Sequence, residues 1–166
     1  MKIRRVLLLV VLVAVGAFAA IQLVPYGRDH TNPPITAEPA WDTRRTEALA
    51  RDACFACHSN ETQWPWYTSV APVSWLTQRD VDDGRATLNF SEWNRVQFEL
   101  QDIGEVVRDG EMPPTQYTLV HGEARLTDAE RRQLAAGLEA TVRTSPPGST
   151  GGASGPGSSD RDGDGD

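Results

Sequence analysis

The sequence is poor in the residues that build small disulfide scaffolds and metal clusters. It has two cysteines, Cys54 and Cys57, and three histidines among 166 residues. Two cysteines cannot form a multi-disulfide framework, and they exclude any metal site that needs four thiolates. Positive charge is also scarce, because 16 Lys and Arg residues stand against 23 Asp and Glu, for a net charge of −7. That balance argues against nucleic acid as a partner, since its binding depends on cationic contacts to phosphate.

The sequence also lacks the alternating apolar and polar pattern of half-buried strands, so it predicts an all-α fold. We expect a helix capped by Asp42 and running to Ala53, and a second helix over residues 73–84. A capping box at Thr127–Glu130 predicts a last helix that ends near Arg143.

A third helix is expected between residues 91 and 110. Ser91 is a candidate N-cap and Gly110 a candidate stop. Apolar residues recur between them at steps of three and four, which predicts one buried stripe: Trp93, Val96, Leu100, Ile103 and Val107.

The N-terminus has the composition of a membrane anchor. Three cations in residues 1–5 precede an apolar run from Val6 to Val24, in which only Gln22 is polar. Nineteen helical residues reach roughly 28 Å, enough for the hydrocarbon core. The cations place the N-terminus in the cytoplasm and the rest on the periplasmic or extracellular face. A cleaved signal peptide is the alternative, because Ala17-Phe18-Ala19 resembles a cleavage site.

Composition divides the chain into four parts. A transmembrane signal-anchor over 1–24 is followed by a proline-rich linker over 25–40, which we expect to be extended and to give the domain reach. Residues 41–143 hold ten of the twelve aromatic residues and should form the folded domain. Residues 144–166 are Gly, Ser, Pro and Asp with no large aliphatic residue, which predicts a disordered acidic tail.

The chemistry is concentrated in residues 54–58, which read Cys-Phe-Ala-Cys-His. This is the pattern of covalent c-type haem attachment. Two thiols three positions apart can each add to one vinyl group of a porphyrin, and the next histidine can present its imidazole to the iron. Cys54 and Cys57 are therefore the predicted thioether sites, and His58 is the predicted proximal ligand.

Two other interpretations of these cysteines exist. A thioredoxin-type redox pair would be expected in a βαβ setting, which the sequence does not predict. A tetrahedral zinc site could combine Cys54, Cys57 and His58 with His121, although Cys57 and His58 would be awkward as adjacent ligands.

A haem iron bound by one histidine has a second axial position. Met112 is the favoured candidate, because it lies in a Gly110 to Pro114 loop that cannot be helical. A thioether ligand also raises the reduction potential of haem iron. His121 is the alternative, and an open position is a third. His30, in the linker, is expected to be exposed to solvent.

Beyond the haem motif, the sequence resembles the small, membrane-anchored haem-binding domain proteins of bacteria, which are related to class I cytochromes c. The resemblance spans residues 22–143 and rests on these segments: Cys54–Asn60, Trp64–Tyr67, Ala71–Leu76, Gly84-Arg85, Leu88–Ser91, Trp93, Met112–Pro114, Tyr117 and His121, with Gln22 and Asn32–Pro34 upstream.

The resemblance implies a small cytochrome c-like helical domain around one covalent haem c, preceded by a single transmembrane helix. It supplies no reaction, because such proteins are typically known as haem binders. We expect the aromatic residues to surround the haem as well as to build the core: Trp64, Trp66, Tyr67, Trp75, Phe90 and Trp93. Arg85 is either a propionate partner or an exposed cation.

Together these observations predict a monohaem electron-transfer protein tethered to the cytoplasmic membrane, with redox proteins as partners and no enzymatic activity. A gas or peroxide sensor, or a small haem catalyst, would need a displaceable sixth ligand. A purely structural haem domain is a third hypothesis.

Overall fold

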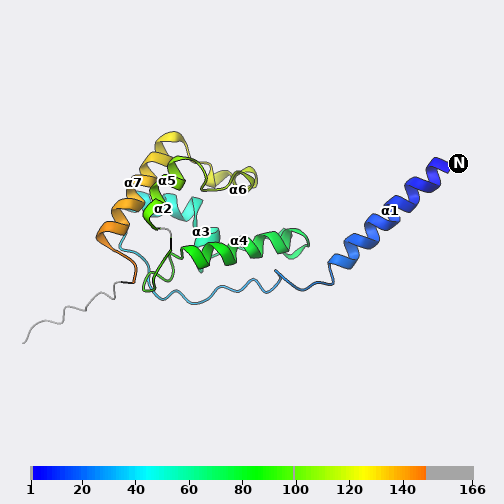
Figure 1. Cartoon of the computed structure of the whole chain (residues 1–166), viewed down its shortest axis with the longest axis horizontal. Helices are drawn as coiled ribbons and strands as arrows, with labels where there is room; N and C mark the ends of the chain where they lie inside the picture. Colours follow the sequence, from blue (N-terminus) through cyan, green and yellow to red (C-terminus); the bar gives the residue numbers. More distant parts are fainter. Residues whose placement is uncertain (1, 99, 149–166) are drawn as a thin grey trace, which may run out of the picture.

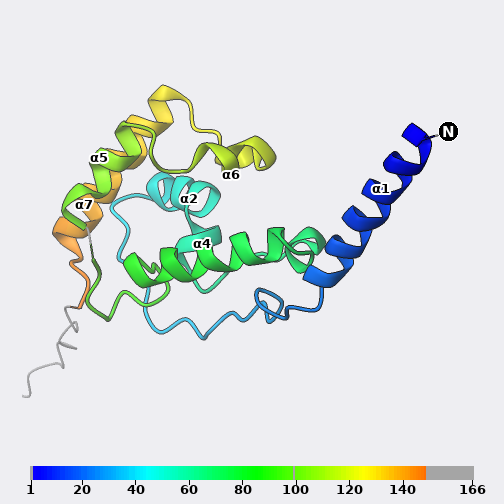
Figure 2. The same ribbon diagram turned by 45° about the vertical axis from the view of Figure 1, so that its right-hand side comes forward.

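The computed structural model describes residues 2–98 and 100–148, and all regular structure in them is helical (Figures 1 and 2). The predicted all-α class is confirmed for this part of the chain. The helices are α1 (Lys2–Ile21), α2 (Arg44–Ala53), α3 (Phe55–His58), η1 (Trp66–Ser69), α4 (Val73–Thr87), η2 (Leu100–Asp102), α5 (Ile103–Arg108), α6 (Thr115–Val120), η3 (Gly122–Ala124) and α7 (Asp128–Thr144).

The core lies where α7 packs against α5 and α2. Leu134 and Leu138 of α7 are fully buried against Leu49 of α2. An aromatic stack extends this core, because the Phe90 ring lies 5.5 Å from that of Phe55 and 5.9 Å from that of Trp93, both nearly parallel. Burial of each large apolar side chain stabilises the fold by about 1.5–3 kcal/mol.

Two helix starts test the capping predictions. The capping box of α7 is confirmed, since Thr127 accepts from the Glu130 N–H and Glu130 accepts from the Thr127 N–H. The cap of α2 is Thr43 rather than Asp42, because the Thr43 hydroxyl accepts from the Thr46 N–H at 3.1 Å. The second predicted helix, α4, runs three residues beyond the expected end.

The predicted helix from Ser91 to Gly110 is wrong in its first half. Residues 91–98 form turns, and α5 begins only at Ile103. A polar side chain occupies a backbone group that a helix would use, because the Gln97 side-chain amide donates to Glu92 O at 2.9 Å. Such local side-chain bonds compete with helix formation. Val96 of the expected stripe is 71% exposed as a result.

Residues 25–37 form a strap that lies along the domain instead of a free tether. Its last part pairs with the 91–93 turn, since the Thr36 N–H donates to Ser91 O at 2.9 Å and the Trp93 N–H donates to Ala37 O at 3.0 Å. Its middle is held by Asn32, whose side-chain amide donates to Thr62 O at 2.8 Å. These bonds correct the expectation that this segment gives the domain reach.

Arg85 of α4 fastens the strap to the segment that follows the cysteines. Its guanidinium donates to the Ser59 and Thr31 carbonyls at 2.8 and 3.0 Å, and to the Asn32 and Thr62 side chains at 2.8 and 3.0 Å. All three nitrogens are therefore engaged by protein acceptors. Neither expectation for Arg85, a propionate partner or an exposed cation, matches this arrangement.

The apolar helix α1 is 20 residues long and has the length and hydropathy needed to cross a membrane, a test that signal sequences also pass. At the other end of the chain, α7 ends at Thr144, and Trp93 donates to Ser145 O at 2.6 Å. The beginning of the predicted tail is therefore bound to the domain. The remainder of that tail, residues 149–166, lies outside the described residues.

The strap generates a stability prediction. We expect Arg85→Gln to lower the free energy of unfolding by roughly 2 kcal/mol, because buried acceptors lose charge-assisted hydrogen bonds. Arg79→Gln is the matched control on the same helix, since Arg79 makes only an exposed ion pair with Asp83 and should change stability by about 0.5 kcal/mol or less. Denaturant unfolding in detergent measures both. Equal losses in the two variants would contradict the role given to Arg85.

Candidate functional site

The haem-attachment motif occupies one tight turn at the junction of α2 and α3. Cys54 closes α2 and precedes α3, and its carbonyl accepts the N–H groups of Cys57 at 3.2 Å and His58 at 2.9 Å. Both thiols are free and half-buried. The turn thus presents two unbridged sulfur atoms and an imidazole from five consecutive residues.

The His58 ring is oriented by the backbone. Its Nδ1 lies 3.1 Å from Leu88 O, and a carbonyl can only accept, so Nδ1 carries the proton. In a neutral imidazole this leaves the Nε2 lone pair available. Burial is the main influence on the ring and lowers the pKa of His58, which favours the neutral form. His58 therefore has the tautomer that a metal-binding histidine needs.

Helix α4 approaches α3, which contains most of the motif, closely at Gly84. A Cβ at this position of α4 would lie 2.6 Å from the carbonyl oxygen of Cys57, well inside any normal contact. Only a residue without a side chain lets α4 pack against α3 here. Because residue 84 has no Cβ, α4 lies directly against the cysteine turn.

Burial raises the pKa of both thiols, to about 12 for Cys54 and about 11 for Cys57. The charges of neighbouring groups add to the effect, from Cys57 on Cys54 and from Asp80 on Cys57. A catalytic redox thiol needs the opposite, a lowered pKa that exposes a reactive thiolate. The electrostatics of the turn therefore do not favour the thioredoxin-type interpretation.

Tyr117 of α6 and His121 at its C-terminal end have stacked rings. Burial raises the pKa of Tyr117, and the charges of Cys57 and Cys54 contribute to the same shift. The Tyr117 ring stacks on that of His121 with centroids 4.0 Å apart. His121 Nδ1 donates to Tyr117 O at 3.1 Å, which leaves Nε2 to accept from the Tyr67 hydroxyl at 3.2 Å. Both ring nitrogens of His121 are therefore occupied.

Met112 lies in the loop between α5 and α6. As the sequence predicted, this loop is not helical, and the backbone N–H of Met112 donates to Val106 O at 3.0 Å. The side chain is 37% exposed. The residue is thus partly exposed while its backbone is fixed to α5.

The aromatic residues expected around the haem are divided among several places. Phe90 and Trp93 belong to the core stack, and Trp66 is 81% exposed. Trp64 stacks on His30 with centroids 4.6 Å apart, and His30 Nε2 donates to Thr68 O at 3.2 Å. His30 is half-buried and bonded, which corrects the expectation of a solvent-exposed residue.

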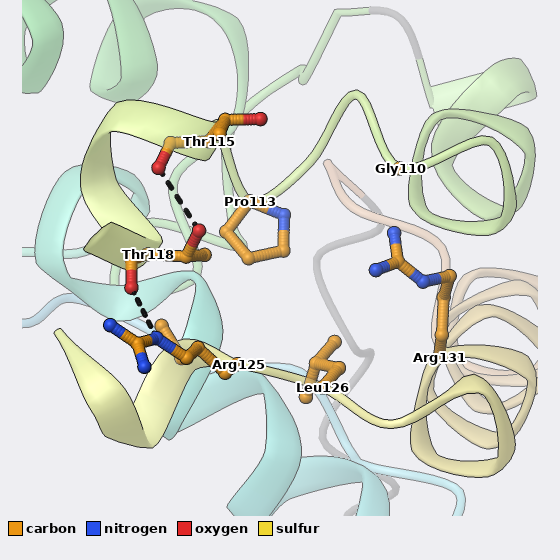
Figure 3. Close-up of a pocket in the computed structure, with 8 residues that line it drawn as sticks. Gly110, Pro113, Thr115, Thr118, Arg125, Leu126 and Arg131 are labelled. Carbon is orange, nitrogen blue, oxygen red and sulfur yellow. Dashed lines mark hydrogen bonds between the residues drawn. The ribbon is translucent and has the colours of Figure 1, made fainter.

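A separate pocket of about 180 Å³ lies beside the Met112 loop (Figure 3). Its volume is below the roughly 300 Å³ of typical small-molecule sites. Its two arginines have structural partners: Arg125 donates to Thr118 O at 2.6 Å, and Arg131 donates to Val107 O at 3.4 Å. They cap the C-terminal ends of α6 and α5, so the pocket is explained by helix capping.

The structure tests the zinc alternative. Within residues 2–98 and 100–148, no three His, Cys, Asp or Glu side chains gather closely enough to hold a metal ion. The zinc set of Cys54, Cys57, His58 and His121 is therefore not assembled. The residues of the motif fit a haem better, because two free thiols and a neutral imidazole with an available Nε2 lie on one turn.

Sequence reasoning from single residues missed the partners of these groups. The Leu88 carbonyl and the close approach at Gly84 carry no signal of their own, because any residue has a carbonyl and many helices contain glycine. Both positions lie in segments that carried the family resemblance, Gly84-Arg85 and Leu88–Ser91. That resemblance was the one signal that could have found them.

A comparison with protein families finds that a family model described as a haem-binding domain matches residues 16–140. The matched range begins inside α1 and includes the strap, in agreement with the many bonds between strap and domain. Comparisons with curated proteins and with solved structures found no match.

The close approach at Gly84 generates the second prediction. We expect Gly84→Ala to lower the free energy of unfolding by about 1–3 kcal/mol through overpacking against Cys57, although alanine is the better helix former by about 1 kcal/mol. The melting temperature, followed by circular dichroism, should fall by several degrees. Gly122→Ala is the control, because its Cβ would meet nothing within 4 Å. A stabilised Gly84→Ala variant would show that the two helices can separate at no cost.

Proposed function

The chain belongs to the haem-binding domain family, and on that premise we propose that it is a membrane-tethered, monohaem c-type cytochrome that carries single electrons outside the cytoplasm. Haem binding follows from the family. Covalent attachment, the axial ligands, the electron-carrier role and the membrane tether are the proposed parts.

The observation that carries the proposal is the hydrogen bond from His58 Nδ1 to Leu88 O. Histidines that bind metals usually donate their second ring nitrogen to a carbonyl or carboxylate, which fixes the tautomer and the ring orientation. His58 has this arrangement directly after the two cysteines. In the proposed function, His58 Nε2 is the proximal iron ligand, and Cys54 and Cys57 hold the haem through thioether bonds.

A bound haem would supply the one-electron chemistry of its iron. The protein's part is to hold the haem in place, to orient His58 and to restrict water around them. The buried side of α3, with Phe55 in the core stack, keeps the motif fixed. No side chain is required to take up a proton or to attack a substrate, and for this reason we propose a carrier and not an enzyme.

Met112 is the proposed sixth ligand. The residue is partly exposed, and its loop is fixed to α5 by the bond to Val106 O. The alternative ligand, His121, would first have to lose the hydrogen bond that its Nε2 accepts from the Tyr67 hydroxyl. Iron binding by His121 would therefore cost a hydrogen bond, and this cost favours Met112 as the sixth ligand.

The third prediction is that the haem is covalently bound. If Cys54 and Cys57 form thioethers, haem should remain with the polypeptide after denaturation and acid–organic extraction, and the mass should exceed that of the bare chain by one haem. The Cys54→Ala/Cys57→Ala double variant should release its haem under the same treatment. Haem that extracts freely from the parent protein would contradict the c-type assignment.

The fourth prediction separates the two candidate sixth ligands. Met112→Ala should lower the reduction potential, because a thioether stabilises ferrous iron, and it should remove the weak far-red band of a methionine–iron bond. His121→Ala is the matched variant and should leave that band in place. Optical spectra and potentiometric titration measure both effects.

The opposite pattern, a spectrum changed by His121→Ala alone, would identify a bis-histidine haem. If neither variant changes the spectrum and carbon monoxide binds the parent rapidly, the sixth position is open. That result would favour the sensor or catalyst hypothesis over the electron carrier.

A further inference from the structure

Residues 62–78 contain no charged side chain, although the folded domain around them is rich in charge. The stretch begins after Glu61, ends before Arg79 and includes η1 and the first part of α4. Its uncharged character is a property of the surface as well as of the sequence, because several of its apolar side chains face outward.

Three of these side chains are strongly exposed: Trp66 by 81%, Leu76 by 61% and Val73 by 40%. We call them the apolar patch. None of the three contributes to the buried core. Large apolar residues exposed near one another on a small domain commonly mark a surface that contacts a partner or a membrane.

The centre of this stretch is bonded to the end of the apolar helix α1. The Gln22 side-chain amide donates to Ala71 O at 2.9 Å and accepts from the Ala71 N–H at 3.0 Å. Both views show the end of α1 beside the end of α4 that starts at Val73 (Figures 1 and 2). The one polar residue of the apolar run therefore links the helix to the middle of the uncharged stretch.

We propose that the apolar patch rests in the headgroup–acyl boundary of the same membrane that α1 spans. The inference depends on the membrane anchor of the proposed function. Lipid is favoured as the occupant because exposed apolar side chains also follow α1 directly, next to the Gln22 that binds Ala71: Leu23 is 84%, Val24 45% and Tyr26 47% exposed. Tryptophan and tyrosine are enriched at this depth of a bilayer.

Because Gln22 holds the domain beside α1, a small apolar patch is sufficient to keep this face on the membrane. A free protein would need a large apolar area to remain on a membrane, whereas a domain already held beside its anchor contacts lipid at a high effective concentration. The absence of charge over 62–78 also means that no ionised group has to lose its water on contact. The bond between Gln22 and Ala71 sets which face of the domain is turned to the bilayer.

Photocrosslinking in the full-length protein, in native membranes, tests this orientation. p-Benzoylphenylalanine in place of Trp66 or Leu76 should form lipid adducts, detected by mass spectrometry. The control is the same residue at Asp83, which is exposed and lies two turns further along the Leu76 side of α4. Adducts at 66 and 76 should exceed those at 83 several-fold.

A second variant tests the contribution of Gln22. Gln22→Ala should reduce the lipid adducts at position 76 several-fold while the protein stays in the membrane fraction after carbonate washing. Equal adducts at 76 and 83 in the parent chain, adducts only with another protein, or no adducts at all would overturn the proposal.

The mass of the purified chain separates failure of the patch from failure of the anchor. An intact N-terminus without lipid adducts at 66 and 76 would reject the patch and leave the anchor standing. A soluble chain that begins near Ala20 would show that α1 is a cleaved signal, and both the membrane anchor and the lipid contact of the apolar patch would then be rejected.

Discussion

The site depends on the way residue 58 is held against residues 88–90. His58 donates from Nδ1 to Leu88 O, and the Phe90 N–H donates to His58 O at 2.8 Å. These two bonds lock the ring and the backbone of one residue to a single short segment. Gly84 makes them possible, because α4 can then approach the cysteine turn closely enough for the chain at its end to reach His58. The aromatic stack through Phe90 connects the same segment to the core. Imidazole orientation, helix packing and core packing are therefore one coupled constraint.

The strap extends this constraint to the N-terminal side of the domain. Asn60 donates from its side chain to Pro34 O at 3.0 Å, and Arg85 binds Asn32 and Thr31. Asn60 lies two residues after His58, and Arg85 directly follows Gly84, which packs against the motif. Removal of residues 25–37 would leave the Asn60 side-chain amide with one acceptor, Glu92, and the Arg85 guanidinium with Ser59 and Thr62 alone. The strap thus supplies acceptors to polar side chains of the domain, and the family match from residue 16 agrees with that.

The sequence was most informative where a local rule acts alone. The capping box of α7, the end of α2 at the cysteines and the non-helical Met112 loop follow from short patterns, and the structure has them. It was misleading where a side chain competes with helical hydrogen bonds, as Gln97 does at the Glu92 carbonyl. The proline-rich segment was misinterpreted for a different reason. Proline content predicts an extended conformation, but it does not tell whether the extended chain finds partners, and here they come from residues 26 or more positions away.

The same helix, α4, links the domain to α1, the membrane anchor in the proposed function. Gln22 binds Ala71 at one end of α4, and Gly84 contacts the cysteine turn near the other. The helix rises about 1.5 Å per residue, so roughly 16 Å of α4 separates Val73 from Gly84. A haem at Cys54 and Cys57 would accordingly lie within a short and fixed distance of the bilayer surface. The proposed carrier would therefore suit partners that are themselves embedded in the membrane, because it would meet them by lateral diffusion while α1 stays inserted.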